Sequence, residues 1–363
     1  MALRPIDSVR RVLGAVAVYN FSCKPEEAYI ANGIAVHNCA YRMEGYTSNE
    51  LFVGNSELSS YGKDNPKRWI PHERALRFID EFKRAGVLGV QFTGGGEPTV
   101  HPHHEEVFQR ALDAGLKCAL VSNGLRWSQR LKQDILPQFA WVRVSIDAGT
   151  PDTYSRIRQT PVGNFEKVLA NTRSLAQWIQ SSGSDCYLGV GWVVTKDNWR
   201  ELIEGVAAAQ STGARYVRLS AEFNPQGVKP YLDIWDDIKA LIAEAKRRYE
   251  SDSFKIVDLF RDRMQDLEDG PPDYPVCAHQ HYTHYIGGDM QAYRCCVLAY
   301  NTRGKVAGGD LTSRPFDEWW ASGERKEDFE SFDARGCKFC QFNDKNRRVN
   351  ALLDINPTHK EFP

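Results

Sequence analysis

The chain has 363 residues, enough for two or three domains, and its 42% hydrophobic and 26% charged content is that of a globular protein. A formal net charge of −1 gives no electrostatic basis for binding nucleic acid or an anionic membrane. No apolar run approaches the ~20 residues that span a bilayer, and the N-terminus lacks the apolar core of a signal peptide. We therefore expect a cytoplasmic protein without nucleic-acid or membrane partners.

Residues 1–38 predict short strands, because they are rich in Val, Ile, Ala and Tyr and contain turn signals at Lys24-Pro25 and Asn32-Gly33. A fragment of this size buries little surface by itself. We expect it to need a complementary partner to complete its fold.

The tripeptide His37-Asn38-Cys39 follows and brings three chemistries together. Asn38 can cyclise and break its bond to Cys39, while His37 can supply the proton that the leaving amine needs. The Cys39 thiolate can accept an acyl group from another chain end.

Beyond Cys39, apolar runs alternate with amphipathic stretches. The predicted strands cover residues 87–93, 117–121, 141–147, 187–194 and 216–219. The predicted helices cover residues 71–82, 105–114, 165–178 and 199–209. This alternation predicts βαβ units and a parallel sheet in a barrel or partial barrel, where ligands collect at the carboxyl ends of the strands.

A charged amphipathic helix is predicted over residues 231–250, and the Asp-Gly-Pro-Pro-Asp run at 269–273 indicates a domain boundary. We expect a barrel domain over 39–230 and a helical linker over 231–270. A small cysteine-bearing domain over 271–363 should follow.

Nine cysteines in a reducing compartment indicate metal or cluster ligation rather than disulfides. Five of them lie in the C-terminal region: Cys277, Cys295, Cys296, Cys337 and Cys340. The Cys-x2-Cys pair lets two thiolates bind one centre, but spacing does not identify the metal, so zinc and iron–sulfur both remain open. His279, His281 and His284 are available to complete a zinc site. Cys118 and Cys186 are expected in the core.

The run from Val18 to Cys39 resembles the C-terminal splicing blocks of inteins. The resemblance covers residues 1–38 and implies that His37, Asn38 and Cys39 carry out splicing at the Asn38–Cys39 bond. Two positions depart from the family pattern. Asn20 replaces the usual acidic residue, and Glu27 stands where many inteins carry His.

Because only the last splicing blocks precede Cys39, we expect the C-terminal fragment of a split intein. Its other half, with an upstream protein segment, would be a separate polypeptide.

The run Gln91-Phe92-Thr93-Gly94-Gly95-Gly96-Glu97-Pro98 resembles radical S-adenosylmethionine (SAM) enzymes when taken with Cys39-Ala40-Tyr41-Arg42 and Ser122-Asn123-Gly124. The resemblance spans residues 39–345 and implies an α/β fold, a partial (β/α)6 TIM-like barrel. In that family a Cys-x3-Cys-x2-Cys loop holds a [4Fe-4S] cluster whose open iron binds SAM. Reduction by a donor such as flavodoxin or ferredoxin cleaves SAM to a 5′-deoxyadenosyl radical, which implies hydrogen abstraction from a substrate.

The resemblance also implies SAM contacts. The turn of Gly95, Gly96, Glu97 and Pro98 would bind the methionyl amine, because glycines permit close backbone approach. Arg158 would pair with the SAM carboxylate, or else be a solvated helix charge. Short polar residues at strand ends suit ribose hydroxyls or the SAM carboxylate, with turn formation and helix capping as their alternative roles: Ser122, Asn123, Ser145 and Asp147.

Cys39 has no partner cysteines at the family spacing. If Cys39 is the third ligand of the SAM cluster, the first two ligands and the first barrel strand must arrive with the upstream segment. Cys39 would then act first as splicing nucleophile and afterwards as iron ligand. The alternative is a plain, partly buried thiol.

The C-terminal region resembles the shortened auxiliary-cluster module of radical SAM enzymes, called twitch or SPASM-like. It implies one auxiliary [4Fe-4S] cluster held by Cys277, Cys295, Cys337 and Cys340, with Cys296 as a substitute for Cys295. The alternative hypothesis is an unspliced, zinc-stabilised α/β binding protein with a decayed intein remnant.

Overall fold

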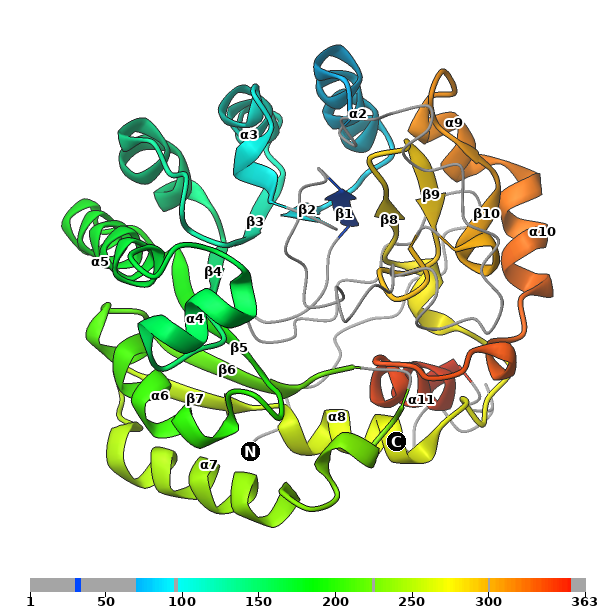
Figure 1. Cartoon of the computed structure of the whole chain (residues 1–363). Helices are drawn as coiled ribbons and strands as arrows, with labels where there is room; N and C mark the ends of the chain where they lie inside the picture. Colours follow the sequence, from blue (N-terminus) through cyan, green and yellow to red (C-terminus); the bar gives the residue numbers. More distant parts are fainter. Residues whose placement is uncertain (1–29, 34–69, 95–96, 224–225, 300, 354–363) are drawn as a thin grey trace, which may run out of the picture.

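The computed structural model of the chain describes residues 30–33, 70–94, 97–223, 226–299 and 301–353. Its centre is one ten-stranded sheet in the order β10-β9-β8-β1-β2-β3-β4-β5-β6-β7. The strands from β1 to β7 pair in parallel, and Figure 1 shows them curving with the helices on their outer side. The predicted α/β class with a parallel sheet is confirmed.

The parallel part of the sheet alternates with helices along the chain. Its strands are β1 (Ile30–Gly33), β2 (Gly89–Thr93), β3 (Lys117–Ser122), β4 (Trp141–Ser145), β5 (Tyr187–Val194), β6 (Tyr216–Ala221) and β7 (Lys255–Asp258). Its helices are α2 (His72–Arg84), α3 (His104–Asp113), α4 (Pro151–Arg158), α5 (Asn164–Ser182), α6 (Leu202–Ser211), α7 (Trp235–Tyr249) and α8 (Phe260–Asp269). No helix in the described part of the chain has the length and apolarity needed to cross a membrane.

The helices pack on the sheet through apolar faces. Phe78 and Phe82 of α2 are fully buried, as are Phe92 of β2 and Phe108 of α3, whose ring centroids lie 4.4 Å apart. A close contact between α6 and β5 explains Gly205, because a Cβ atom there would lie 1.3 Å from the Trp192 ring. Close packing of the core therefore requires the buried aromatic rings and also a residue without a side chain at position 205.

The expected absence of the first barrel strand is wrong for the chain as it stands. Strand β1 lies between β2 and β8 and pairs in parallel with both, with Ala31 opposite Gln91 and Tyr285. Residues 30–33 belong to the segment expected to be an intein fragment. Sheet pairing uses backbone groups of any sequence, so an edge left by one segment is open to another.

The stretch expected to be a helical linker, residues 231–270, extends the sheet. Strand β7 pairs in parallel with β6, and α7 and α8 flank it in the chain. The four residues Lys255–Asp258 contain only two apolar side chains between charged ones. A strand this short gives no clear period-2 pattern.

The C-terminal module continues the same sheet. Strands β8 (Tyr285–Ile286), β9 (Gln291–Tyr293) and β10 (Lys305–Asp310) form an antiparallel meander beside β1, and the Gly287-Gly288-Asp289 segment lies in the turn between the first two. The helices of the module are α9 (Phe316–Ala321), α10 (Gly323–Ser331) and α11 (Asn343–Leu353).

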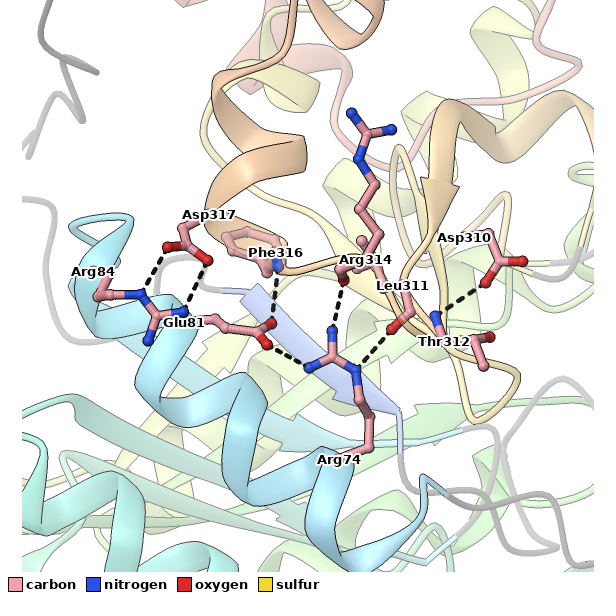
Figure 2. A network of polar contacts seen from close by, with 9 residues as sticks. All are labelled: Arg74, Glu81, Arg84, Asp310, Leu311, Thr312, Arg314, Phe316 and Asp317. Atoms are coloured by element: carbon pink, nitrogen blue, oxygen red, sulfur yellow. Dashed lines mark hydrogen bonds and ion pairs between the residues drawn. The ribbon is translucent and has the colours of Figure 1, made fainter.

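A buried ion pair on α2 fastens this module to the barrel, as Figure 2 shows. The Arg74 guanidinium lies 2.6 Å from the Glu81 carboxylate and donates to the carbonyl oxygens of Leu311, at 2.7 Å, and Arg314, at 2.9 Å. The other Glu81 oxygen accepts the backbone N–H of Phe316 at 2.8 Å. Both charged side chains are almost fully buried. The pair thus satisfies three backbone groups of the segment between β10 and α9.

Candidate functional site

Glu97 is a buried carboxylate just beyond the end of β2. Its Oε1 accepts hydrogen bonds from the backbone N–H of Thr99 at 3.0 Å, from the Thr99 hydroxyl at 2.7 Å and from the Ser122 hydroxyl at 2.7 Å. Its Oε2 accepts the Asn123 backbone N–H at 2.6 Å. Glu97 thus ties the segment that follows β2 to the end of β3.

The turn after β3 is equally well fixed. The Ser122 hydroxyl accepts the backbone N–H of Gly124 and the indole N–H of Trp127, both at 3.0 Å. Gly124 has φ +71°, and a Cβ atom there would come within 2.9 Å of Val144. Only glycine suits this conformation. The hydrogen-bonding capacity of the Ser122 hydroxyl is therefore used up, whereas Asn123 is half-buried.

Asp147 and Arg158 form a buried ion pair at the end of β4. Asp147 has φ +59°, and its second carboxylate oxygen accepts the Val193 backbone N–H at 2.7 Å. Burial raises the pKa of Asp147, while the charge of Arg158 opposes that rise. The Asn198 amide donates to the Asp147 carbonyl at 2.9 Å. The structure therefore brings together two residues to which separate SAM contacts were assigned. Arg158 is half of a buried ion pair and not a solvated helix charge.

The remaining predicted SAM residues divide into two groups. Ser145 is the last residue of β4 and is half-buried, and Pro98 is buried at the start of the 3-10 helix η1 (Pro98–Val100). Gly95 and Gly96 lie outside the described residues. The splicing residues lie outside them as well: His37, Asn38 and Cys39.

Glu222 also lies at the carboxyl edge of the sheet, but the sequence patterns did not predict it as a site residue. It follows β6 directly, and its backbone N–H donates to the Tyr231 hydroxyl at 2.7 Å. Burial raises the pKa of Glu222 to about 7, helped by the charges of Asp197 and Asp147. Its position after an apolar strand was the available signal. A carboxyl group that holds its proton near neutral pH can act as an acid at this edge.

Replacing Glu222 with Gln should stabilise the chain more at pH 8 than at pH 5. The folded-state pKa is raised from 4.5 to about 7, so the unfolded state loses its proton first and stability falls as pH rises between these values. At pH 8 the gain is at most about 3 kcal/mol. Urea denaturation at both pH values measures the gain in stability. An equal gain at pH 5 and pH 8 would contradict a Glu222 carboxyl group that keeps its proton to near neutral pH.

Four cysteines line one cavity in the C-terminal module: Cys277, Cys295, Cys337 and Cys340. An antiparallel bridge between Val276 and Asp333 brings the first of them to the Cys-x2-Cys loop. Cys295 follows β9. Cys296 points elsewhere, because its sulfur accepts the Gln341 amide at 2.9 Å and does not line the cavity.

The surroundings of the cavity suit thiolates. The Cys340 sulfur accepts the backbone N–H of Phe342 at 3.4 Å and the Asn346 amide at 3.6 Å. Burial raises the pKa of Cys277 to about 11 and of Cys340 to about 12, so a bound cation is needed to hold them ionised. Cations flank the site. Arg294, itself buried, is close enough to lower the pKa of Cys277 and Cys337.

The cysteine sulfurs are spread more widely than a single zinc ion would hold them. A single tetrahedral zinc with Zn–S bonds of ~2.3 Å holds its sulfurs roughly 3.8 Å apart. Among the described residues, no three ligand atoms at this cavity lie within 4.8 Å of one another. A four-iron cluster bonds each thiolate to a different iron and so holds them farther apart.

The three histidines expected as possible zinc ligands pack against aromatic rings. His279 lines the cavity and stacks on Phe342 with 3.8 Å between centroids, and burial lowers its pKa to about 3. His281 contacts Phe329. His284 is enclosed by Trp319, Trp320 and Phe329.

The arrangement defines an α/β partial barrel with buried carboxylates at the carboxyl edge of its sheet and a cysteine-lined cavity in an appended module. Residues 37–204, slightly less than half of the chain, match the Radical SAM superfamily model, which supports a radical SAM domain in this part of the chain. The match begins two residues before Cys39.

The sequence is also similar to individual proteins of known name. Over 152 residues, covering 41% of each protein, the chain is 29% identical to the AdoMet-dependent heme synthase of Methanosarcina barkeri. Over 196 residues it is 27% identical to the mycofactocin maturase MftC of Mycobacterium tuberculosis, covering 53% of this chain and 46% of MftC. The matches thus span less than half the length of these relatives.

Solved structures show the same fold. Streptococcus suis SuiB bound to its precursor peptide SuiA superposes with a TM-score of 0.54 and 14% identity, covering 72% of this chain and 60% of SuiB. The anSMEcpe protein with bound AdoMet gives a TM-score of 0.52 and 12% identity, covering 83% and 82%.

Proposed function

We propose that this chain is the precursor of a radical SAM enzyme, joined by protein trans-splicing at the Asn38–Cys39 bond to an upstream half. One observation carries the proposal: the radical SAM match begins at His37, one residue before the intein-like segment ends at Asn38. Counted back from Cys39, the family spacing places the other two cluster ligands at Asn32 and Val36. Neither binds iron as a thiolate, so the upstream half supplies them.

The described site would then bind SAM at the carboxyl edge of the sheet. Among the described residues, three donors reach Oε1 of Glu97 and one reaches Oε2, so Oε2 would offer an acceptor position to the methionyl amine. Arg158, held in place by its ion pair with Asp147, would pair with the SAM carboxylate. When bound and reduced, the cluster supplies the electron that cleaves SAM, and flavodoxin or ferredoxin is the kind of donor required.

The C-terminal cavity would hold one auxiliary [4Fe-4S] cluster of the twitch or SPASM-like kind. Its four thiolates arise from three separate segments, and Arg294 offsets the negative charge of a tetrathiolate centre. Cys295 is the ligand, and Cys296 is held away by Gln341.

Anaerobic reconstitution of the unspliced chain with iron and sulfide tests this assignment. We expect about four irons per chain and no SAM cleavage, because the SAM cluster lacks two ligands. Cys277→Ala, Cys295→Ala, Cys337→Ala and Cys340→Ala should each lose most of this iron.

Two controls accompany the series. Cys296→Ala removes a neighbouring thiol outside the cavity, and Cys118→Ala removes a buried thiol of β3; both should keep the iron. Tight zinc binding in place of iron, or loss of iron in Cys296→Ala alone, would overturn the assignment.

A further inference from the structure

A second group of metal-ligating side chains lies on the barrel, away from the cysteines. His72, His103 and Glu106 offer ligand atoms that all lie within 4.8 Å of one another. Among the residues that the structure describes, it is the only such group of three or more. Neither SAM binding nor the auxiliary cluster uses it.

The three residues come from adjacent helix starts. His72 is the first residue of α2, His103 is the residue before α3, and Glu106 lies in the first turn of α3. In a βα unit these starts lie at the carboxyl edge of the sheet. The 3-10 helix η1 connects the group directly to Glu97. The group therefore shares the edge on which SAM is proposed to bind.

The geometry favours a shared cation over a simple ion pair. The Nε2 atom of His72 is shielded from solvent and 2.8 Å from the Glu106 Oε2 atom, yet it makes no hydrogen bond of acceptable angle. His103 Nδ1 lies 3.9 Å from the same oxygen, and the two imidazoles stack with 3.9 Å between centroids. Three possible metal-ligand atoms thus converge within 4.8 Å of one another.

A neighbouring histidine holds the two helix starts in place. His101 is buried, and its Nε2 bonds the Ile70 carbonyl at 2.9 Å, two residues before His72. Its Nδ1 accepts the backbone N–H of His103 at 3.2 Å. The second bond fixes the tautomer, because an accepting Nδ1 leaves the proton on Nε2. His101 is thus a positioning residue for both imidazoles.

We propose that His72, His103 and Glu106 bind one divalent transition-metal ion of the zinc class. Two imidazoles and a carboxylate are the ligands of open zinc sites, and they leave positions for water or an anionic group. Glu106 supplies the negative charge that offsets the unfavourable field of two helix N-termini. This site does not depend on splicing or on either iron–sulfur cluster.

Cobalt titration of the full chain tests the proposal, because Co²⁺ adopts zinc geometry and its absorption distinguishes thiolate from nitrogen and oxygen ligands. We expect one bound Co²⁺ without thiolate-to-metal charge transfer, in addition to any thiolate-bound ion. His103→Gln and Glu106→Gln should weaken this site by at least about 100-fold. Both side chains are about half exposed, so the variants should fold normally.

Glu105→Gln is the matched control. Glu105 is the adjacent acid of the same helical turn, but it contacts Ser128 and Arg130 instead of the histidines. It should bind Co²⁺ as the parent does. Equal binding by the parent and His103→Gln, or a parent spectrum showing only thiolate-bound cobalt, would show a stacked histidine pair without a metal and overturn the proposal.

Discussion

Replacing Arg74 with Ala should lower the free energy of unfolding by about 3–5 kcal/mol. The change leaves the buried Glu81 charge uncompensated and removes the donors to the carbonyls of Leu311 and Arg314. It also removes the guanidinium that lies 3.7 Å from the centre of the Phe78 ring. Urea denaturation followed by circular dichroism measures the loss.

Arg84→Ala is the matched control on the same helix. Arg84 pairs with Asp317 across the same contact, at 2.7 Å and 3.1 Å, but its side chain is 56% exposed. Its loss should change stability much less. The double variant Arg74→Met, Glu81→Met should recover only part of the loss, because the Phe316 N–H and two carbonyls stay unpaired. Equal losses of stability in Arg74→Ala and Arg84→Ala would contradict the claim that the buried Arg74–Glu81 pair contributes more than the exposed Arg84–Asp317 pair.

Co-expression with the matching upstream half should turn a chain without SAM-cleaving activity into an active enzyme. Splicing would bring two more cysteines into line with Cys39 and give the sheet a strand from the upstream half where β1 now lies between β2 and β8. Anaerobic formation of 5′-deoxyadenosine under reduction measures the gain. Asn38→Ala blocks cyclisation while keeping the cysteine, so it should stay inactive. SAM cleavage by the unspliced chain alone would contradict the proposal that two of the three cluster ligands come from the upstream half.

Much of the fold could be predicted from the sequence, because buried parallel strands give continuous apolar runs. Residues 117–121 and 187–194 were predicted as strands, and β3 and β5 cover them. β7 was missed because its four residues carry too little pattern. β1 was missed as a barrel strand because pairing there depends on which backbone edge is open.

The contacts made by the candidate site residues could not be predicted from the sequence. Polar residues at strand ends were identified, yet the pairing of Asp147 with Arg158 depends on a positive φ that sequence patterns do not reveal. The raised pKa of Glu222 depends on what covers its carboxyl group. Which of Cys295 and Cys296 lines the cavity depends on the direction in which each side chain leaves the backbone after β9.

The intact mass of the co-expressed product tests the central claim most directly. Trans-splicing predicts one polypeptide that has lost residues 1–38 and gained the upstream protein segment, joined through a peptide bond to Cys39. Asn38→Ala should keep residues 1–38 attached under the same conditions. A parent product that retains residues 1–38 and carries no added segment would contradict the account.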